Sequence, residues 1–155
     1  FIWLKETPGL YDFIVVAFPD PSNFSLGKLY TTTFYIELRK HLAGGGAAVV
    51  QSTSPLFARQ SFWCIATTMR SVGLTVTPCH VYVPSFGEWG FMVATHGAYT
   101  VPAVYPAGLR FLNGSTATTL FDFPDDMKPV PAEINRLNNQ ILVHYYDAEW
   151  RKLAP

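Results

Sequence analysis

The stretch FIVVAFPDPSNFSLGKLY, Phe13 to Tyr30, decides the fold class of this chain. Its first six residues are apolar without alternation, which predicts a strand covered on both faces, as in the centre of a parallel sheet. Pro19 and Pro21 follow and flank a single carboxylate, Asp20. Because proline restricts its own backbone and favours extended geometry in the residue before it, Asp20 is expected to be held at the carboxyl end of this strand.

Alternating helix and strand patterns follow this stretch. Apolar residues at helical spacing predict helices over residues 28–42 and 55–72. Apolar or alternating runs predict strands over residues 47–51, 75–83 and 89–95. Helical connections make the first three strands parallel, whereas the short turn before the fourth makes the last pair antiparallel. The order therefore predicts an α/β fold.

Two features at the borders of these segments lead to further expectations. The run Gly44-Gly45-Gly46 is expected to stop the helix that precedes the second strand. Residues 1–6 have the pattern of a helix end, and the chain begins with Phe rather than Met. We therefore expect a fragment of a longer protein.

The alternation of helix and strand patterns ends after residue 96. A proline-rich connector leads to predicted helices over residues 116–121 and 131–153. We expect a single partial domain over residues 1–155, in which residues 1–96 form the sheet portion and residues 97–155 form the connector and a helical tail.

Composition narrows the class of protein. The 155 residues are 49% hydrophobic and 14% charged, with a net charge of zero, which suits a packed core and gives no electrostatic reason to expect nucleic acid as a partner. Two cysteines, Cys64 and Cys79, do not make a disulfide framework and indicate a reducing, cytoplasmic setting. No apolar run approaches the roughly 18 residues of a membrane span.

Polar side chains are expected at the carboxyl ends of three strands, where open parallel sheets bind ligands. Asp20 follows the first strand, Gln51 ends the second, and Ser85 and Phe86 follow the third. Tyr30 also falls near this edge. A carboxylate with restricted backbone freedom favours an amine cation as its partner. The alternative is that Asp20 only caps the next turn.

Other polar residues give weaker signals. The four histidines show no metal-ligand spacing with each other or with the cysteines, so we expect no metal. Ser52 and Ser54 lack the Gly-x-Ser-x-Gly pattern of a nucleophile, and helix capping is favoured for them. Packing is favoured for both cysteines. The acidic residues at 122, 125 and 126 are expected in a solvated loop.

Four stretches together resemble the spermidine synthases and related polyamine aminopropyltransferases. The segment YDFIVVAFPDPSNFSLGKLYTTTFY resembles a family motif that reads Tyr-Asp-hydrophobic-Asp-x-x-Asp-Pro, and LAGGGAAVVQSTSP resembles the helix end, strand and Gln that follow it. The segment PSFGEWGFMVAT resembles the hairpin that ends the catalytic sheet. The segment EINRLNNQILVHYYDAEWRKL resembles the tail of a bacterial subgroup whose catalytic domain follows a membrane-embedded amino-terminal half.

This resemblance implies the carboxyl-terminal half of a class I methyltransferase-like (Rossmann-like) sheet that ends in an antiparallel hairpin, with carboxyl-terminal helices. It implies transfer of an aminopropyl group from decarboxylated S-adenosylmethionine, the co-substrate, to putrescine or a similar amine, with no prosthetic group. The implied partners are a polyamine and a nucleoside sulfonium. In a parent protein attached to the inner membrane, the catalytic domain would lie on the cytoplasmic side.

The resemblance also assigns roles to residues. Asp20 matches the second aspartate of the motif, which binds the substrate amine, and Gln51 matches a Gln near the active site. The first aspartate, the expected proton acceptor, is replaced by Ala17. A substrate-side Tyr of the family falls near Pro84, so Ser85 or Phe86 would stand in for it. The other implied assignments are Tyr30 for the substrate and Pro21, Ser25 and Leu26 for the cofactor.

The glycine-rich nucleoside loop of the family has no counterpart here. The Gly44–Gly46 run cannot replace it, because that run follows a helix and precedes a strand. We therefore expect an aminopropyltransferase-like fragment that is inactive by itself. Two alternatives stay open: a methyltransferase-like domain that uses S-adenosylmethionine, and a non-catalytic fragment that forms homo-oligomers through an exposed sheet edge.

Overall fold

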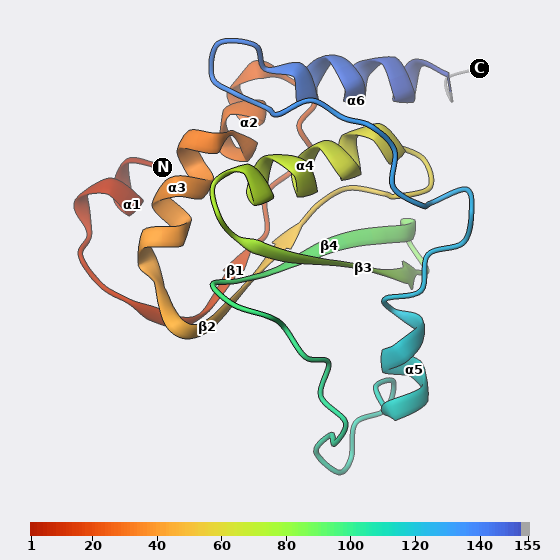
Figure 1. Ribbon diagram of the computed structural model, residues 1–155. Coiled ribbons are helices and arrows are strands. Elements are labelled where there is room, and N and C mark those ends of the chain that lie inside the picture. The colour runs from red at the N-terminus through yellow and green to blue at the C-terminus, as the bar shows by residue number, and fades with distance from the viewer. Residues whose placement is uncertain (153–155) are drawn as a thin grey trace.

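A computed structural model describes residues 1–152, which form a four-stranded sheet with most of the helices on one side (Figure 1). The strands are β1 (Tyr11–Val16), β2 (Leu42–Gln51), β3 (Thr75–Val83) and β4 (Gly87–Thr95). The helices are α1 (Ile2–Glu6), α2 (Phe24–Gly27), the 3₁₀-helix η1 (Lys28–Tyr30), α3 (Thr32–His41), α4 (Arg59–Ser71), α5 (Gly114–Thr119) and α6 (Ile141–Arg151).

The strand order in the sheet is β1-β2-β4-β3. β1 and β2 are parallel, with Val16 opposite Val50, and β4 is antiparallel to both β2 and β3. The predicted directions of the strands are therefore confirmed. The sequence did not predict that β4 lies between β2 and β3. It fits there because the α4 crossover leaves one strand position open beside β2, and the short turn keeps β4 next to β3.

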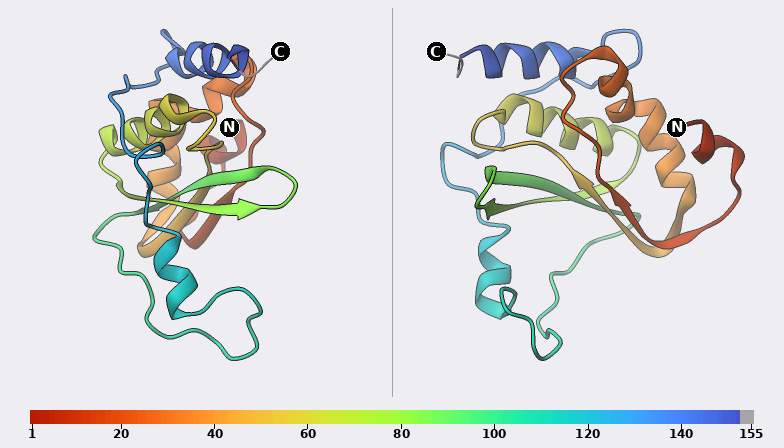
Figure 2. Two further views of the ribbon diagram at one scale, coloured as in Figure 1. Left: turned by 90° about the vertical axis from the view of Figure 1, so that its right-hand side faces the viewer. Right: turned by 180° about the vertical axis from the view of Figure 1, so that it is seen from behind.

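Helices α3, α4 and α6 form two layers on one side of the sheet (Figure 1). Helices α3 and α4 cover one face, and α6 lies across α4 on the side away from the sheet (Figures 1 and 2). Helix α5 and the connector before it lie on the opposite side of the sheet (Figure 2). The core between sheet and helices is rich in fully buried aromatic and aliphatic side chains, which include Tyr30, Phe34, Tyr35, Leu38, Phe62, Ile65, Met69 and Met92.

The expectation that three glycines stop a helix was wrong. Helix α3 ends earlier, at His41, and Gly44, Gly45 and Gly46 lie within β2. A β-carbon on Gly46 would come within 2.9 Å of the carbonyl oxygens of Tyr11 and Asp12. Glycine is therefore needed for close approach to β1, at the place where the register of the two strands shifts.

Several helices also differ from their predicted limits. Helix α4 starts at Arg59 rather than at residue 55, because Ser54 Oγ accepts hydrogen bonds from two backbone N–H groups of the preceding turn. Asn113 caps α5, which therefore begins at Gly114 rather than at residue 116. The predicted helix over residues 131–153 is reduced to α6, and its last predicted residue lies outside the described residues. Residues 131–140 are irregular.

Candidate acceptor site at the carboxyl ends of the strands

Tyr30 supports the loop that carries Asp20. Its hydroxyl donates to the carbonyl of Pro19 at 3.0 Å and lies 3.3 Å from that of Phe18. Its side chain is 1% exposed, and burial, with Asp20 nearby, raises the pKa of its phenol. Tyr30 thus remains a protonated donor that supports the loop from the core, and its predicted substrate contact stays a prediction.

The Asp20 carboxylate is directed inward. Its Oδ2 accepts hydrogen bonds from Tyr146 Oη at 2.9 Å and from Thr53 Oγ1 at 3.3 Å. Its Oδ1 is buried, and no donor within residues 1–152 reaches it. Burial raises the pKa of this carboxyl, although the two hydrogen bonds act in the opposite direction. Asp20 therefore has one held oxygen and one oxygen that lacks a partner.

The next turn is capped by another residue. Asn23 Oδ1 accepts a hydrogen bond from the Leu26 N–H at 3.1 Å, at the start of α2. The structure thus gives the capping role considered for Asp20 to Asn23.

Thr53 has an unusual backbone conformation. Its φ of 58° is left-handed, a region that β-branched residues rarely adopt and that concentrates at functional sites. Two hydrogen bonds hold it: Gly90 N–H donates to the Thr53 carbonyl at 2.7 Å, and Ser52 N–H donates to the Gly90 carbonyl at 2.9 Å. Sequence reasoning considered the two flanking serines and missed Thr53, because nothing in its own context marks that backbone.

Gln51 and Phe86 line a common cavity of about 280 Å³ at the same edge of the sheet. Its other walls are Val83, Trp89 and Phe91. Four apolar or aromatic walls with one amide suit an alkyl chain that carries a polar group. Ser85 is exposed in the turn beside Phe86.

The other predicted site residues, Asp20 and Tyr30 included, are not among the residues that line this cavity. Ala17 is exposed and lines an apolar cavity of about 450 Å³ beside β1, whose walls include Phe18 and Phe34. Ser25 and Leu26 belong to α2, which contacts α6, and Pro21 is buried in the loop before it. Their nucleoside-binding role stays a prediction.

Helix α6 supplies Tyr146 to the site, and the sequence did not predict its contact with Asp20. The same helix carries Glu149, which contacts α4 instead. The Glu149 carboxylate accepts hydrogen bonds from the backbone N–H groups of Gln60 at 2.6 Å and Ser61 at 3.1 Å. A carboxylate at the amino end of α4 is favourable for the helix dipole. The residues of α6 showed only an apolar stripe in the sequence, so a polar contact far away in the chain was not predictable.

The two cysteines and His80 lie in surroundings that suit a structural role. Burial raises the pKa of the Cys64 thiol to about 12 and that of Cys79 to about 11, which disfavours the thiolate of either residue. His80 Nδ1 lies 2.9 Å from Glu88 Oε2, and His80 Nε2 lies 2.7 Å from the carbonyl oxygen of Asp122. The side chain of His80 therefore connects β3 with the segment after α5. Within residues 1–152, no group of three histidine, cysteine or acidic residues has an arrangement that could hold a metal ion.

Comparison with known proteins identifies the family. The sequence model of the spermine/spermidine synthase domain matches residues 1–103. This chain belongs to the spermine/spermidine synthase family. It is 50% identical over 153 residues to a polyamine aminopropyltransferase of Leptospira interrogans, covering 99% of this chain and 31% of that protein. It is 45% identical over 150 residues to polyamine aminopropyltransferase 2 of Ralstonia nicotianae, covering 96% of this chain and 29% of that protein.

Solved structures confirm the fold expected for a spermine/spermidine synthase relative. Spermidine synthase from Thermotoga maritima superposes with a TM-score of 0.66 at 16% identity, over 80% of this chain and 44% of that one. A spermidine synthase in complex with the transition-state analogue AdoDATO gives a TM-score of 0.67 at 19% identity, over 80% of this chain and 45% of that one. The chain spans about a third of the length of the curated relatives. No helix within residues 1–152 is long and apolar enough to cross a membrane.

Proposed function

We propose that this chain forms the amine-binding side of the catalytic domain of a polyamine aminopropyltransferase, which transfers an aminopropyl group from decarboxylated S-adenosylmethionine to putrescine or a similar amine. The observation that carries this proposal is the Asp20 carboxylate, whose buried Oδ1 lacks a donor within residues 1–152. An ammonium group supplies both the charge and the hydrogen bond that this oxygen lacks. Membership in the family supports the reaction type.

The reaction requires little covalent participation by the protein. The neutral amine nitrogen attacks the carbon next to the sulfonium, the carbon–nitrogen bond forms as the carbon–sulfur bond breaks, and the attacking nitrogen releases a proton. The sulfonium is already a good leaving group, so the protein mainly orients the reactants and holds the distal ammonium. Asp20 has the second task. Gln51 and Phe86 flank the cavity that suits the methylene chain.

The expected proton acceptor is missing from this site. Ala17 occupies the position where the family resemblance places a carboxylate, and a methyl group accepts no proton. We therefore propose that the chain by itself is inactive, and that the protein that contains it reacts slowly unless another base serves. Other parts of the proposal are a nucleoside contact by Pro21, Ser25 and Leu26, a cytoplasmic catalytic domain, and self-association of the chain.

Calorimetric titration of the full-length protein with putrescine tests the amine site. We expect putrescine to bind the wild type, and Asp20→Asn, which keeps the size of the side chain, to weaken that binding at least tenfold. Leu137→Lys, a substitution on the exposed surface, is the control and is expected to leave binding unchanged. Binding of ordinary S-adenosylmethionine without any diamine would instead favour a methyltransferase and contradict the proposal.

The replacement Ala17→Asp in the full-length protein tests the missing acceptor. We expect the rate of aminopropyl transfer to rise by about 10²-fold or more, the range of general-base catalysis, with little change in putrescine affinity. The product is measured by mass spectrometry. Absence of transfer both before and after this replacement would remove the assigned reaction.

A further inference from the structure

The contact between Tyr146 and Asp20 joins two segments that lie 126 positions apart in the chain. Tyr146 belongs to α6, and α6 lies beyond residue 103, where the match to the family's sequence model ends. The helix is therefore an element outside that matched domain that reaches back to the candidate site. The question is whether Tyr146 only attaches the helix or also prepares Asp20 for its ligand.

The hydrogen bonds of Asp20 are unevenly distributed. Both donors, Tyr146 and Thr53, bind the same oxygen, Oδ2, whereas Oδ1 is buried without a donor within residues 1–152. The Tyr146 contact, at 2.9 Å, is well within hydrogen-bond range, and the Thr53 contact, at 3.3 Å, is long. Without Tyr146, little would prevent rotation of the carboxylate about its Cβ–Cγ bond. Tyr146 thus determines which oxygen remains available.

Helix α6 is held firmly enough to place a hydroxyl with this accuracy. Glu149 binds the amino end of α4 with both carboxylate oxygens, and Leu142 N–H donates to the buried Asn135 side chain at 3.3 Å. At the start of α6, Val143 packs so closely on Gly27 that a β-carbon on the glycine would lie 2.4 Å from it. Three separate contacts therefore fix the position of the helix relative to Asp20.

We propose that Tyr146 is a positioning residue for the acceptor amine: it holds Oδ2 of Asp20 so that Oδ1 accepts one ammonium group of a diamine. Helix α6 is thereby part of the amine site, although it contacts the substrate only through Asp20. This inference rests on the proposed function. Burial and the neighbouring Asp20 raise the pKa of the Tyr146 phenol, so its hydroxyl keeps its proton and donates throughout the neutral range.

The substitution Tyr146→Phe in the full-length protein tests this role, because it removes the hydroxyl and keeps the ring that packs near Trp150. We expect the dissociation constant for putrescine to rise about tenfold by calorimetry. In the transfer assay the KM for the amine should rise, with the KM for decarboxylated S-adenosylmethionine and the melting temperature nearly unchanged. The matched control is Tyr145→Phe, because the Tyr145 hydroxyl binds Glu133 instead, at 3.2 Å. It should leave the dissociation constant for putrescine unchanged.

A double-substitution cycle separates positioning from a general effect on the fold. If Tyr146 acts through Asp20, Tyr146→Phe weakens putrescine binding in the wild type but not further in Asp20→Asn. Equal weakening in both backgrounds, or none in the wild type, would overturn the inference. The proposed function fails by a different result, namely no putrescine binding by the wild type or full binding by Asp20→Asn.

Discussion

The carboxyl end of β1 and the lateral edge of the same strand differ sharply in how the chain surrounds them. Beyond the carboxyl end of β1, Asp20 is enclosed by Tyr30, Thr53 and Tyr146, which come from three different parts of the fold. Along the strand itself, one edge has no neighbouring strand within residues 1–152. Phe13 is 63% exposed there. The chain therefore holds one oxygen of this carboxylate through contacts from distant segments and leaves an apolar edge beside it open.

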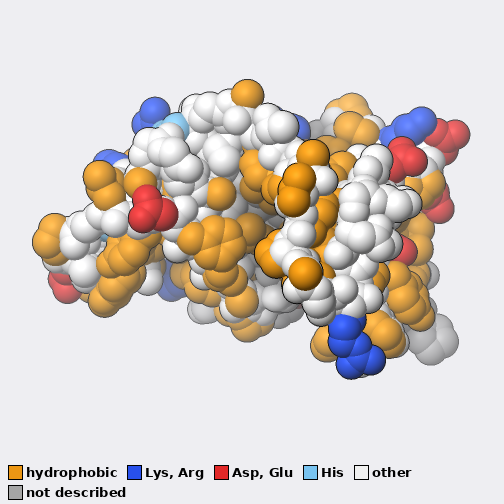
Figure 3. All heavy atoms as spheres, turned by 90° about the horizontal axis from the view of Figure 1, so that it is seen from below, with side chains coloured by type: hydrophobic (Ala, Val, Ile, Leu, Met, Phe, Trp, Pro, Cys, Tyr) orange, Lys and Arg blue, Asp and Glu red, His pale blue; other side chains and the backbone are white. Residues whose placement is uncertain are grey.

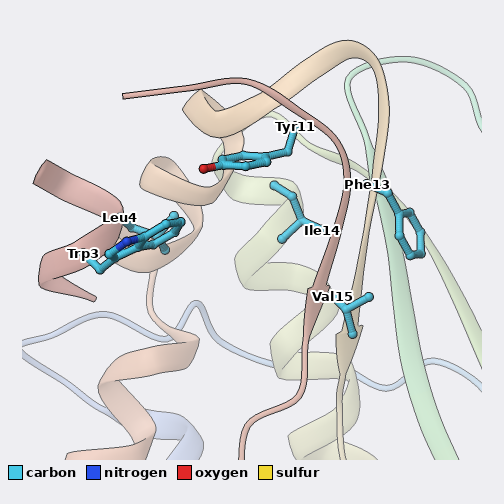
Figure 4. Close-up of a pocket in the computed structure, with 6 residues that line it drawn as sticks. All are labelled: Trp3, Leu4, Tyr11, Phe13, Ile14 and Val15. Carbon is cyan, nitrogen blue, oxygen red and sulfur yellow. The ribbon is translucent and has the colours of Figure 1, made fainter. Parts of the chain in front are cut away.

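Beside the open edge, β1 and α1 border a cavity (Figure 4). In Figure 4, Tyr11 and Ile14 of β1 point toward Trp3 and Leu4 of α1 and border a cavity of about 220 Å³, whereas Phe13 points away from them. Figure 3 shows apolar side chains spread over much of the face of the molecule opposite the covering helices. The contrast is that the hydrogen bonds to the Asp20 carboxylate come from within this chain, whereas the open edge is suited to a further strand.

Breaking the enclosed end should have the largest effect. Asn135 is fully buried, and its side chain bonds the carbonyls of Gly27 and Tyr30 at 3.1 Å each and the Leu142 N–H. We expect Asn135→Leu to lower the free energy of unfolding by roughly 2–4 kcal/mol, because it leaves these three buried groups without partners. The measurement is urea denaturation.

The same substitution at Asn138, an exposed neighbour, is the control for Asn135. We expect Asn138→Leu to change the free energy of unfolding by less than about 0.5 kcal/mol. Equal effects at the two positions would show that the buried hydrogen bonds around α6 do not hold the enclosed end together.

A change at the open edge of β1 should have an effect of intermediate size. We expect the isolated chain to self-associate through β1, and Phe13→Lys to weaken this association about tenfold, because a charge on an edge strand opposes strand pairing. Sedimentation velocity across a range of concentrations measures it. Leu137→Lys places the same charge at another exposed position and should not weaken the association. A chain that stays monomeric at high concentration would contradict the expectation.

The smallest expected effect concerns the start of β1. The two ring nitrogens of His41 each lie 2.8 Å from a carbonyl oxygen, one of Glu37 and one of Thr7, just before the strand. Since carbonyls only accept, both contacts are hydrogen bonds only when both nitrogens carry protons, and these two backbone carbonyls raise the pKa of His41 above 6.5. We expect His41→Ala to lower the free energy of unfolding by about 1 kcal/mol, the net value of a typical hydrogen bond.

The direction of the pKa shift determines how the contribution of His41 to stability changes with pH. Because the pKa of His41 is raised in the folded state, its stabilising contribution is fully present below about pH 6.5, the pKa of an unperturbed histidine in the unfolded chain. It is lost as the pH rises through the higher folded value. The difference in melting temperature between wild type and His41→Ala should therefore shrink between pH 6 and pH 9. A difference that stays constant over this range would show that the proton on His41 is not involved.

Local patterns predicted those parts of the molecule that depend on neighbours in the chain. The unbroken apolar run from Phe13 to Phe18 predicted a strand, and the helix–strand alternation predicted the directions of all four strands. The expectation that β1 is a central strand covered on both faces was wrong: it lies at the edge of the four-stranded sheet, and Phe13 is 63% exposed. The placement of Gly46 within a strand was not predictable, because it depends on close approach to a backbone more than 30 residues earlier. The same limit applies to Asn135, whose role lies in contacts with two distant segments, at Gly27 and at Thr68.

By itself, the sequence determined the α/β class, the carboxylate at the end of β1 and the resemblance to a family, because each follows from short runs of residues. Only the tertiary structure decided that β4 enters between β2 and β3, that Thr53 adopts a left-handed backbone, and that Tyr146 reaches Asp20. These features arise from packing between segments far apart in the chain, where one hydroxyl or one glycine acquires its role only from the atoms that surround it.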